Sequence, residues 1–267
     1  MSLSKGTGPF GENRAGIGNY RIDSPKHILH FDPSPKRVRG FFKGEAVVDS
    51  TNVKLLHETG HLPVYYFPLE DVRREFLEGS DHTTYCPFKG NASYRSVVVG
   101  EGRAEDTVWM YEKPLEEAAF LEGHVAFYFD RMDAWFEEDE EIFVHPRDPY
   151  SRIDILASSR HIRVSVEGQD FAETDRPMLL FETSLPTRYY IPKEDVWMDL
   201  LEISGHVTEC PYKGQPVHFS VPSLGDVGKH LAWCYENPQP EAEKVRGLIA
   251  FYNERVDLEI DGRKIEG

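Results

Sequence analysis

Residues 82–90 read HTTYCPFKG, and residues 206–214 read HVTECPYKG. The two stretches lie 124 residues apart, and the same offset aligns Gly44 with Gly168 and Asp133 with Asp257 without a gap. Chance does not hold one register for so long. The period is much longer than the roughly 20–50 residues of solenoid repeats, so each copy is long enough to be a domain with its own core. The sequence therefore predicts two tandem domains of one kind.

The aligned blocks suggest where the domains begin and end. We expect a flexible N-terminal arm over residues 1–36, a first repeat over 37–143, a linker over 144–160 and a second repeat over 161–267. The arm is rich in glycine and has no apolar core, so it does not resemble a secretory signal. The stretch WFEEDEE, residues 135–141, reads as an acidic insertion just before the linker.

Short runs rich in β-branched and aromatic residues dominate both copies, among them PVYYF, YRSVVVG and TVWMYE in the first and HIRVSV, TRYYI and VHFSV in the second. Such runs, separated by glycine and proline, are typical of strands. Helix signals are few: PLEEAAFLEGH and PQPEAEKVRG each have proline near the start and a terminal glycine. We expect a mainly β (α+β) protein with one or two short helices in each domain.

Several of these blocks carry a resemblance to a known family. CPYKG, WCYENP and IAFYNERVDLEIDG, with CPFKG and WMYEKP in the first copy, resemble the family catalogued as domain of unknown function 427 over about residues 37–262. The resemblance implies two β-tent-like domains, each built from antiparallel sheets that meet at an angle. Relatives of that fold usually hold a structural zinc through two C-x-x-C pairs, which this sequence lacks. The nucleotidyltransferase label sometimes given to the family gains no support, since there is no Gly-rich phosphate loop.

Composition narrows the classes of partner and compartment. The formal net charge is -16 and no basic stripe is present, so binding to DNA or RNA is disfavoured. No window approaches the roughly 20 apolar residues of a membrane span. The three cysteines form no C-x-x-C pair, which fits a reducing compartment. We therefore expect a cytoplasmic protein that binds neither nucleic acid nor membrane, with no cofactor indicated.

Each copy contains the sequence Cys-Pro-aromatic-Lys-Gly. Proline fixes φ and glycine permits positive φ, so we expect a tight turn between strands that presents one lysine. The candidate catalytic residues are then Cys86, Lys89, Cys210 and Lys213. A nearby ammonium favours a thiolate nucleophile, and the lysine alone could hold an anionic or carbonyl group. The structural alternative is a hairpin turn with a buried thiol.

A second shared motif is Trp-x-Tyr-Glu-x-Pro, in which Trp and Tyr fall on one face of a strand and Glu on the other. Aromatic side chains with a few polar groups are the usual composition of a ligand pocket. The alternative is core packing with a helix-capping Glu. The predicted ligand-binding residues are Tyr65, Tyr66, Tyr94, Trp109, Tyr111 and Glu112 in the first copy and Tyr189, Tyr190, Trp233, Tyr235 and Glu236 in the second.

Histidines supply two weaker patterns. His57-Glu58-Thr59-Gly60-His61 matches H-E-x-x-H, but Gly60 and the following proline disfavour the helix that a zinc protease needs. We expect no metal, with His57 and His61 as weak candidates. His82 and His206 each precede a cysteine by four residues, which on a straight strand is about 13 Å, too far for a Cys–His couple without a bend. The alternative is a hydrogen-bonded structural histidine.

These patterns lead to one hypothesis with one rival. We expect a small-molecule binding protein, or an enzyme whose reaction the sequence does not identify, with an aromatic pocket beside the Cys-Pro-aromatic-Lys-Gly turn. If only one copy works, the first is favoured, because Ser93-Tyr94 keeps the family pattern there. The rival is a non-catalytic interaction module that uses both repeats as a composite surface and the acidic segment 135–141 to contact a basic protein.

Overall fold

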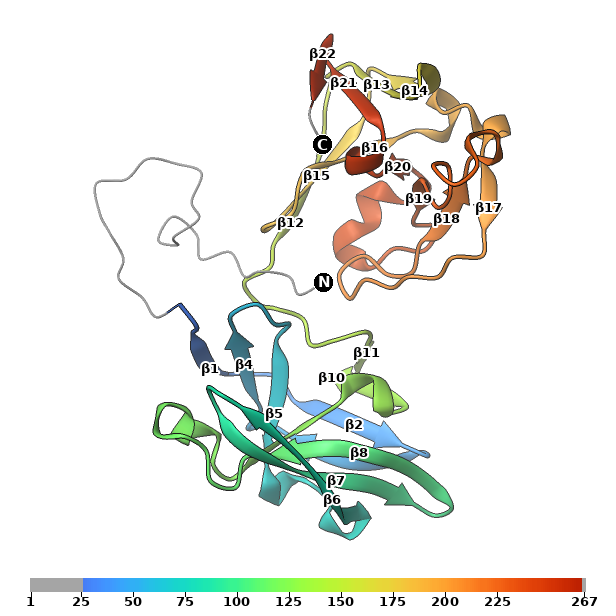
Figure 1. Cartoon of the computed structure of the whole chain (residues 1–267). Helices are drawn as coiled ribbons and strands as arrows, with labels where there is room; N and C mark the ends of the chain where they lie inside the picture. The colour runs from blue at the N-terminus through green and yellow to red at the C-terminus, as the bar shows by residue number, and fades with distance from the viewer. Residues whose placement is uncertain (1–25, 266–267) are drawn as a thin grey trace, which may run out of the picture. The chain divides into compact units, whose positions relative to one another are not determined.

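A computed structural model describes residues 26–265 and divides the chain into two units, up to Asp148 and from Pro149 onward. Both units are mainly β, and each contains one seven-stranded and one four-stranded antiparallel sheet. Figure 1 labels the strands of each unit along the chain. The expected fold class is therefore confirmed.

The large sheet of the first repeat has the order β1-β4-β5-β9-β8-β7-β6, and the small sheet has the order β11-β10-β2-β3. The strands are β1 Leu29–Pro33, β2 Val38–Phe42, β3 Glu45–Ser50, β4 Lys54–Glu58, β5 Val64–Pro68, β6 Leu77–Cys86, β7 Gly90–Val99, β8 Gly102–Met110, β9 His124–Phe127, β10 Ala134–Glu137 and β11 Glu140–Ile142.

The second repeat has the same topology, with a large sheet in the order β12-β15-β16-β20-β19-β18-β17 and a small sheet in the order β14-β13-β21-β22. The strands are β12 Ile153–Ala157, β13 Ile162–Val166, β14 Gln169–Thr174, β15 Met178–Glu182, β16 Arg188–Ile191, β17 Glu202–Ser204, β18 Val217–Ser220, β19 Ala232–Cys234, β20 Ile249–Phe251, β21 Asp257–Ile260 and β22 Arg263–Ile265.

The internal repeat extends to the pairing register. Leu29 of β1 lies opposite Glu58 of β4, and Ile153 of β12 lies opposite Glu182 of β15. Strand β1 falls within the segment where we expected the arm, and β12 falls within the segment where we expected the linker. Both belong to the large sheet of their repeat. The rest of the expected arm, residues 1–25, lies outside the described residues.

Within residues 26–265, helical structure is limited to short 3₁₀ helices. The longest two, Glu116–Leu121 and Pro240–Val245, occupy the predicted helical segments, and the first is kinked at Ala118. The remainder are single turns: Leu69–Asp71, Arg74–Phe76, Phe129–Arg131, Lys193–Asp195, Met198–Leu200, Pro222–Leu224 and Asn253–Arg255. Gly123 and Gly247 end the two longer segments with φ of +76° and +71°, a conformation that glycine adopts at little cost.

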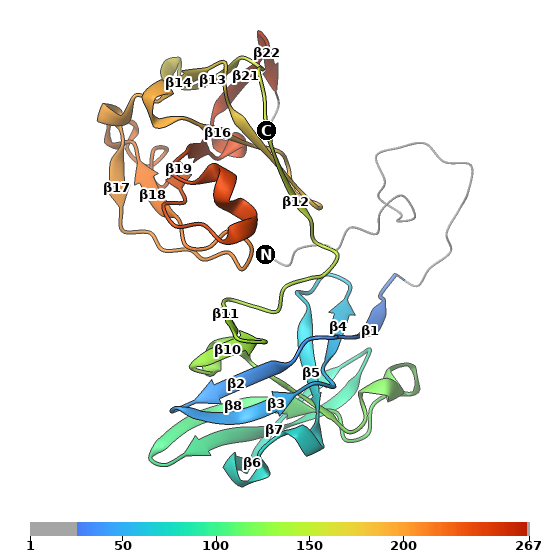
Figure 2. The same ribbon diagram turned by 180° about the vertical axis from the view of Figure 1, so that it is seen from behind.

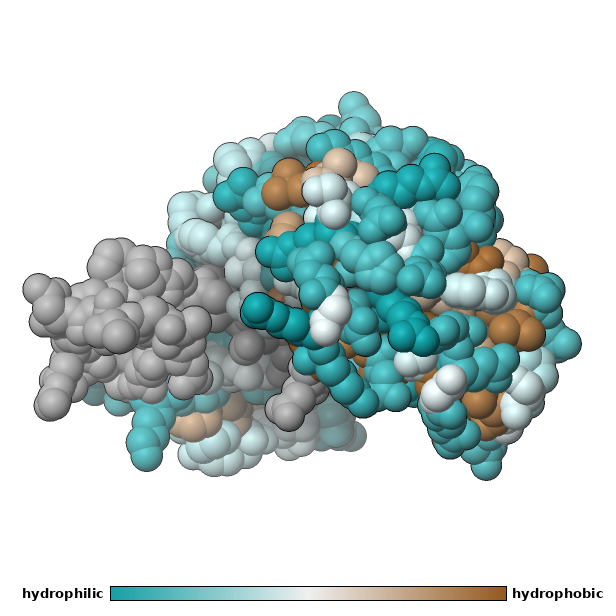
Figure 3. All heavy atoms as spheres, turned by 90° about the horizontal axis from the view of Figure 1, so that it is seen from above, coloured by the Kyte–Doolittle hydropathy of each residue, from teal (hydrophilic) through white to brown (hydrophobic). Residues whose placement is uncertain are grey.

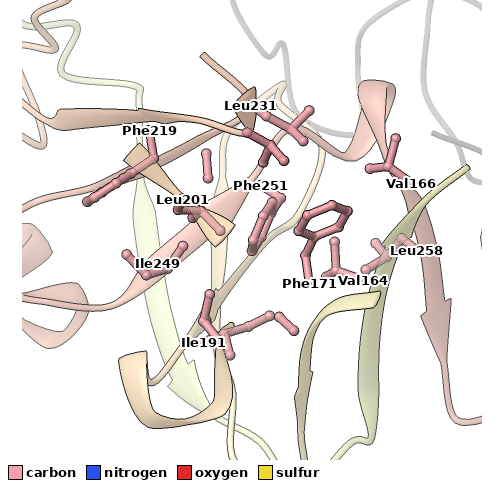
Figure 4. Packing of buried hydrophobic residues seen from close by; sticks show 14 of the residues in the cluster. Val164, Val166, Phe171, Ile191, Leu201, Phe219, Leu231, Ile249, Phe251 and Leu258 are labelled. Atoms are coloured by element: carbon pink, nitrogen blue, oxygen red, sulfur yellow. The ribbon is translucent and has the colours of Figure 1, made fainter. Parts of the chain in front are cut away.

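Each repeat has a main core in which the two sheets contribute buried side chains. In the first repeat, Val38 and Val48 of the small sheet belong to the same cluster as Phe67 and Val125 of the large sheet. Figure 2 shows the repeat from behind, with β2 and β3 in the layer opposite β7 and β8. The equivalent core of the second repeat is drawn in Figure 4, where side chains from both sheets meet, among them Phe171, Ile191, Phe251 and Leu258.

The segment 135–141 differs from the acidic insertion that we expected. Trp135 is buried on β10, and Ile142 is buried on the paired strand β11. Glu137 is also buried and accepts hydrogen bonds from Tyr65 and Lys36. The equivalent hairpin, β21 and β22, exists in the second repeat, so the segment is part of the fold. The error arose because four consecutive acidic residues, 138–141, are exposed around the turn from β10 to β11 and dominate the composition of the segment.

Exposed side chains are largely hydrophilic, as Figure 3 shows for one face of the molecule. This agrees with a sequence that contains 46 acidic and 30 basic residues. Among the described residues, no helix is both long and apolar enough to cross a membrane.

Candidate functional site

A row of side chains runs across the large sheet of the first repeat, on the face opposite the main core. Tyr94 of β7 lies opposite Trp109 of β8, and Trp109 lies opposite Ala126 of β9, which in turn lies opposite Tyr66 of β5. Residues opposite one another in a sheet point to the same face. Tyr94, Ala126 and Tyr66 belong to a second, smaller buried cluster, and Trp109 packs against it. Because the Ala126 side chain is small, the Tyr66 and Trp109 rings on either side of it can contact one another.

A pocket with a volume of about 480 Å³ lies on this face. Three predicted ligand-binding residues line it, Tyr94, Trp109 and Tyr111, together with one candidate catalytic residue, Lys89. Five residues that we did not single out complete it: Glu58, His61 as a pocket residue, Leu62, Val64 and Tyr128. The pocket therefore combines the rings of three tyrosines and one tryptophan with an imidazole, an ammonium and a carboxylate.

The predicted turn brings Lys89 to this pocket. Cys86 and Gly90 pair at the ends of β6 and β7, and Gly90 has a φ of +101°, which is strained for other residues. The Lys89 amide donates to the Cys86 carbonyl oxygen (3.3 Å), and the Leu115 amide donates to the Lys89 carbonyl oxygen (3.1 Å). Gly214 repeats this geometry with a φ of +93°. The sequence interpretation of a tight, lysine-presenting turn is confirmed.

The lysine is held by a buried carboxylate. Lys89 donates to Glu58 Oε2, and the other carboxylate oxygen lies 3.0 Å from His27 Nε2. Burial by itself raises the pKa of Glu58, but the hydrogen bond and charge of Lys89 outweigh it and lower the pKa below its usual value. Lys213 and Glu182 form the same pair in the second repeat. Each ammonium therefore already has an anionic partner.

Beneath the pocket, a buried tyrosine fixes the tryptophan. Trp109 Nε1 donates to the Tyr66 hydroxyl oxygen (3.3 Å), and Trp233 Nε1 donates to that of Tyr190 (3.2 Å). Burial raises the pKa of Tyr66 and of Tyr190 well above the usual range, so both remain neutral donors and acceptors. The orientation of the indole is thus set by the protein and requires no ligand.

The tyrosine pair of β5 does not act as a unit. Tyr66 points to the pocket side, whereas Tyr65 lies in the main core and donates to Glu137. Tyr189 likewise packs against the main core of the second repeat. Glu112 is outside the pocket lining, with its carboxylate 2.9 Å from Ser93 Oγ. Its counterpart Glu236 pairs with Lys193 at the surface (2.7 Å), so the Glu takes the face away from Trp and Tyr, as the strand alternation predicted.

All three thiols are free, and among the residues that the structure describes, the two that begin the turns, Cys86 and Cys210, lack the histidine partner that a Cys–His couple needs. Cys86 and Cys210 are half-buried, while Cys234 is fully buried. Within residues 26–265, neither Cys86 nor Cys210 is hydrogen-bonded to a histidine. The His82 ring instead lies 4.4 Å from the Tyr94 ring. Nothing in this geometry favours a Cys–His couple.

The H-E-x-x-H match lies on a strand and not on a helix. His57 and Glu58 end β4, and Gly60 follows with a φ of +78°. His61 lines the pocket with Glu58, but His57 points elsewhere, with Nε2 at 3.7 Å from Asp32 Oδ2. The strand ends at Glu58 and the chain turns at Gly60, so the two histidines do not converge on one site. No group of three metal-ligating side chains occurs in the described part of the chain.

The second repeat keeps the aromatic corner but covers it. The Trp233 and Tyr252 rings lie 4.5 Å apart at 51°, which matches the 4.7 Å and 47° of Trp109 and Tyr128. Arg188 places its guanidinium carbon 5.7 Å from the Trp233 centroid and 5.9 Å from the Tyr252 centroid. The equivalent residue in the first repeat is Val64, which leaves the corner uncovered.

Two site residues escaped the sequence analysis although both copies contain them. Glu58 aligns with Glu182, but we considered Glu58 only as part of a zinc motif. Tyr128 aligns with Tyr252 and directly follows the last residue of β9. Retention of an acidic or aromatic residue at the end of a strand in both copies was the available signal.

A histidine cluster distinguishes the second repeat and predicts acid sensitivity. His218 replaces Tyr94, and it is 1% exposed. Burial, followed by the nearby His206 and His230, lowers its pKa from 6.5 to about 4. As the pH falls below 6.5, this histidine takes up a proton in the unfolded chain but not yet in the folded one. The folded state therefore loses stability relative to the unfolded state between pH 6.5 and about 4.

We expect His218→Tyr to remove this loss. Tyr94 contacts Thr84 Oγ1 (2.9 Å) as His218 contacts Thr208 Oγ1 (2.7 Å), so a tyrosine finds the same partner. Urea unfolding of the second repeat, measured at about pH 7 and about pH 5, checks the expectation. An equal loss of stability in wild type and variant would show that another group causes the acid sensitivity.

The comparisons with known proteins agree with the internal repeat. The model of the family described as a domain of unknown function (DUF427) matches residues 30–138 and again residues 154–262. A search of curated proteins finds no match. The two matched ranges follow the two structural units and together span most of the sequence. The chain therefore belongs to the DUF427 family and contains two copies of its domain.

Proposed function

We propose that the protein binds a small molecule in the pocket of the first repeat. The observation that carries this proposal is the pocket itself, which has a volume of about 480 Å³ and a lining of four aromatic rings around the Lys89–Glu58 pair. Ligand sites in proteins are typically about 300–1,000 Å³, mostly apolar, with few polar groups. In this proposal Trp109 and Tyr128 contact a flat or cationic part of the ligand.

The Lys89–Glu58 pair supplies the polar contacts in this proposal. Lys89 donates one N–H group to Glu58 and presents the others to an anionic or carbonyl oxygen of the ligand. The Glu58 carboxylate offsets part of the positive charge of the ammonium. The family pattern and the open corner both favour the first repeat over the second. An enzymatic role would need a nucleophile or acid at the pocket, and Cys86 beside the turn is the candidate.

A ligand screen by thermal shift tests this function, with Tyr128→Ala as the site variant. Tyr128 is 36% exposed, so its removal leaves the core intact. Compounds that raise the melting temperature of the wild type are expected to lose most of that shift in Tyr128→Ala. The matched control is Tyr252→Ala, which removes the equivalent ring of the second repeat and is expected to leave the shift unchanged. Compounds that stabilise Tyr128→Ala as well as wild type would overturn the proposal.

The rival function is a non-catalytic interaction module. Its acidic segment 135–141 offers the exposed Glu140 and Glu141, whereas Trp135 and Glu137 are buried and unable to contact a partner. The segment therefore offers a basic partner fewer accessible side chains than the sequence suggested. A basic partner whose binding is lost in Glu140→Gln/Glu141→Gln but kept in Tyr128→Ala would favour it.

We also infer a cytoplasmic location. The three cysteines are all free, and Cys234 is buried. Free thiols persist in reducing compartments. Fractionation of cells that express the full chain is the direct test, and recovery with secreted proteins would contradict the inference.

A further inference from the structure

In the second repeat an arginine side chain covers the pair of aromatic rings whose counterparts line the open pocket of the first repeat. Arg188 begins β16, and its guanidinium lies over the Trp233 and Tyr252 rings at 5.7 and 5.9 Å. Glu254 holds it with two hydrogen bonds, Nη1 to Oε2 (2.8 Å) and Nη2 to Oε1 (2.7 Å). A planar guanidinium between aromatic faces and a bidentate carboxylate is a favourable arrangement for a cation.

The first repeat presents the same receptor without that cation. Val64, Trp109 and Tyr128 line one pocket, and Val64 takes the position of Arg188. Asp130 takes the position of Glu254, on the 3₁₀ turn directly after the tyrosine in both repeats. Within residues 26–265, Asp130 has no ion-pair partner. Its side chain is one methylene shorter than that of Glu254, which leaves more space for a group that is not tethered.

The charges of the two sites support this reading. In the second repeat, Lys213 pairs with Glu182 and Arg188 pairs with Glu254. In the first repeat Lys89 pairs with Glu58, and the valine substitution removes the second cation. Lys89 is therefore the one lysine or arginine among the residues that line the open pocket, whereas Lys213 and Arg188 both stand at the equivalent place in the second repeat.

A neighbouring arginine does not fill the position. The Arg131 guanidinium carbon lies 4.3 Å from the Tyr128 centroid, and Arg131 Nη1 donates to the Glu105 and Asp106 carbonyl oxygens. Arg255 is its counterpart in the second repeat, and it lies over Tyr252 at 5.9 Å while Arg188 is also present. Arg131 therefore belongs to the framework that both repeats share.

We propose that the pocket of the first repeat binds a guanidinium-bearing ligand, whose cation lies against Trp109 and Tyr128 where Arg188 lies in the second repeat, with Asp130 as its counter-ion. This inference rests on the proposed small-molecule function and names the chemical class of the ligand. The shared chemistry is the planar cation, whether it belongs to a free small molecule or to an arginine in a peptide.

The probe is n-butylguanidinium, with n-butylurea as a neutral compound of the same shape. We expect one equivalent of n-butylguanidinium to bind per chain, and to bind on the order of tenfold more tightly than n-butylurea. The readouts are calorimetry and the NMR signal of the Trp109 indole N–H, identified with Trp109→Phe. Acetyl-arginine amide in a parallel titration distinguishes a peptide arginine from a free small molecule.

Two reciprocal variants test the position. Val64→Arg supplies the tethered cation and is expected to abolish binding, whereas Arg188→Val is expected to open the second site and add a second binding equivalent. Equal binding of n-butylurea, or unchanged binding to Val64→Arg, would overturn the inference. If screened ligands bind in a Tyr128-dependent way but are neutral or anionic and no guanidinium probe binds, the pocket function stands and this inference fails.

Discussion

Lys89→Met is expected to destabilise the first repeat by about 3–5 kcal/mol, because it leaves the Glu58 carboxylate buried without its ammonium. The Glu58 side chain is 8% exposed and that of Lys89 is 11% exposed, so water does not replace the lost partner. A methionine occupies similar volume and creates no large cavity, which isolates the effect of charge. Urea unfolding followed by tryptophan fluorescence measures the change.

Two comparisons make this prediction specific. Glu58→Gln/Lys89→Met removes both charges and is expected to recover most of the loss, because replacement of a whole buried pair is far less costly than loss of one partner. Lys213→Met is the matched variant of the second repeat. The carboxylate of its partner Glu182 is 4% exposed. Ser151 takes the position of His27, which contacts Glu58 in the first repeat. We therefore expect Lys213→Met to lower the free energy of unfolding at least as much as Lys89→Met. A change below about 1 kcal/mol in both single variants would mean that the pairs behave as surface ion pairs.

Trp135→Ala is expected to destabilise the first repeat by a similar amount, about 3–5 kcal/mol, through loss of a large buried side chain. Trp135 is 2% exposed, and its indole N–H donates to the Phe129 carbonyl oxygen (3.0 Å). Its ring stacks on Phe67 and Phe129, with centroids 5.9 and 5.3 Å away. The same unfolding measurement applies, with loss of one core tryptophan signal taken into account.

Gly40 provides the control for this packing. A Cβ atom on Gly40 would lie 2.6 and 2.8 Å from two Trp135 ring atoms, so Gly40→Val alone is expected to be destabilising. The second repeat has Val164 and Glu259 at the two positions and fills the space from the other strand. Gly40→Val/Trp135→Ala should therefore cost less than the sum of its single variants. Additive costs would show that the two residues do not share the space.

The sequence alone predicted local structure well where backbone chemistry decides it. The Cys-Pro-aromatic-Lys-Gly turn formed as expected, because Gly90 and Gly214 supply the positive φ that the turn requires. Trp109 and Tyr111 line the pocket and Glu112 does not, as predicted, although β8 itself ends at Met110. The acidic stretch 135–141 was misread because its exposed residues outnumber its buried ones.

Contacts between distant strands were not predictable in this way. The partner of Lys89 is Glu58, which lies 31 residues away on β4. This strand is not a neighbour of β6 or β7, the strands that the turn connects. Tyr65 lies in the main core, whereas Tyr66 lies on the pocket side. To predict this difference, one must know which face of β5 meets the small sheet. Periodicity shows that a strand has two faces, but it does not show which face the rest of the chain covers.

The 124-residue offset by itself determined that this protein is one β architecture built twice, since a fixed register over so many residues implies the same strands in the same order. Only the tertiary structure decided how the two copies differ at the aromatic corner of the large sheet. A single change, Val64 in one copy and Arg188 in the other, leaves one aromatic corner open and covers the equivalent corner. The physical reason is that the effect of this residue depends on rings from two other strands, which the chain brings together only when the sheet forms.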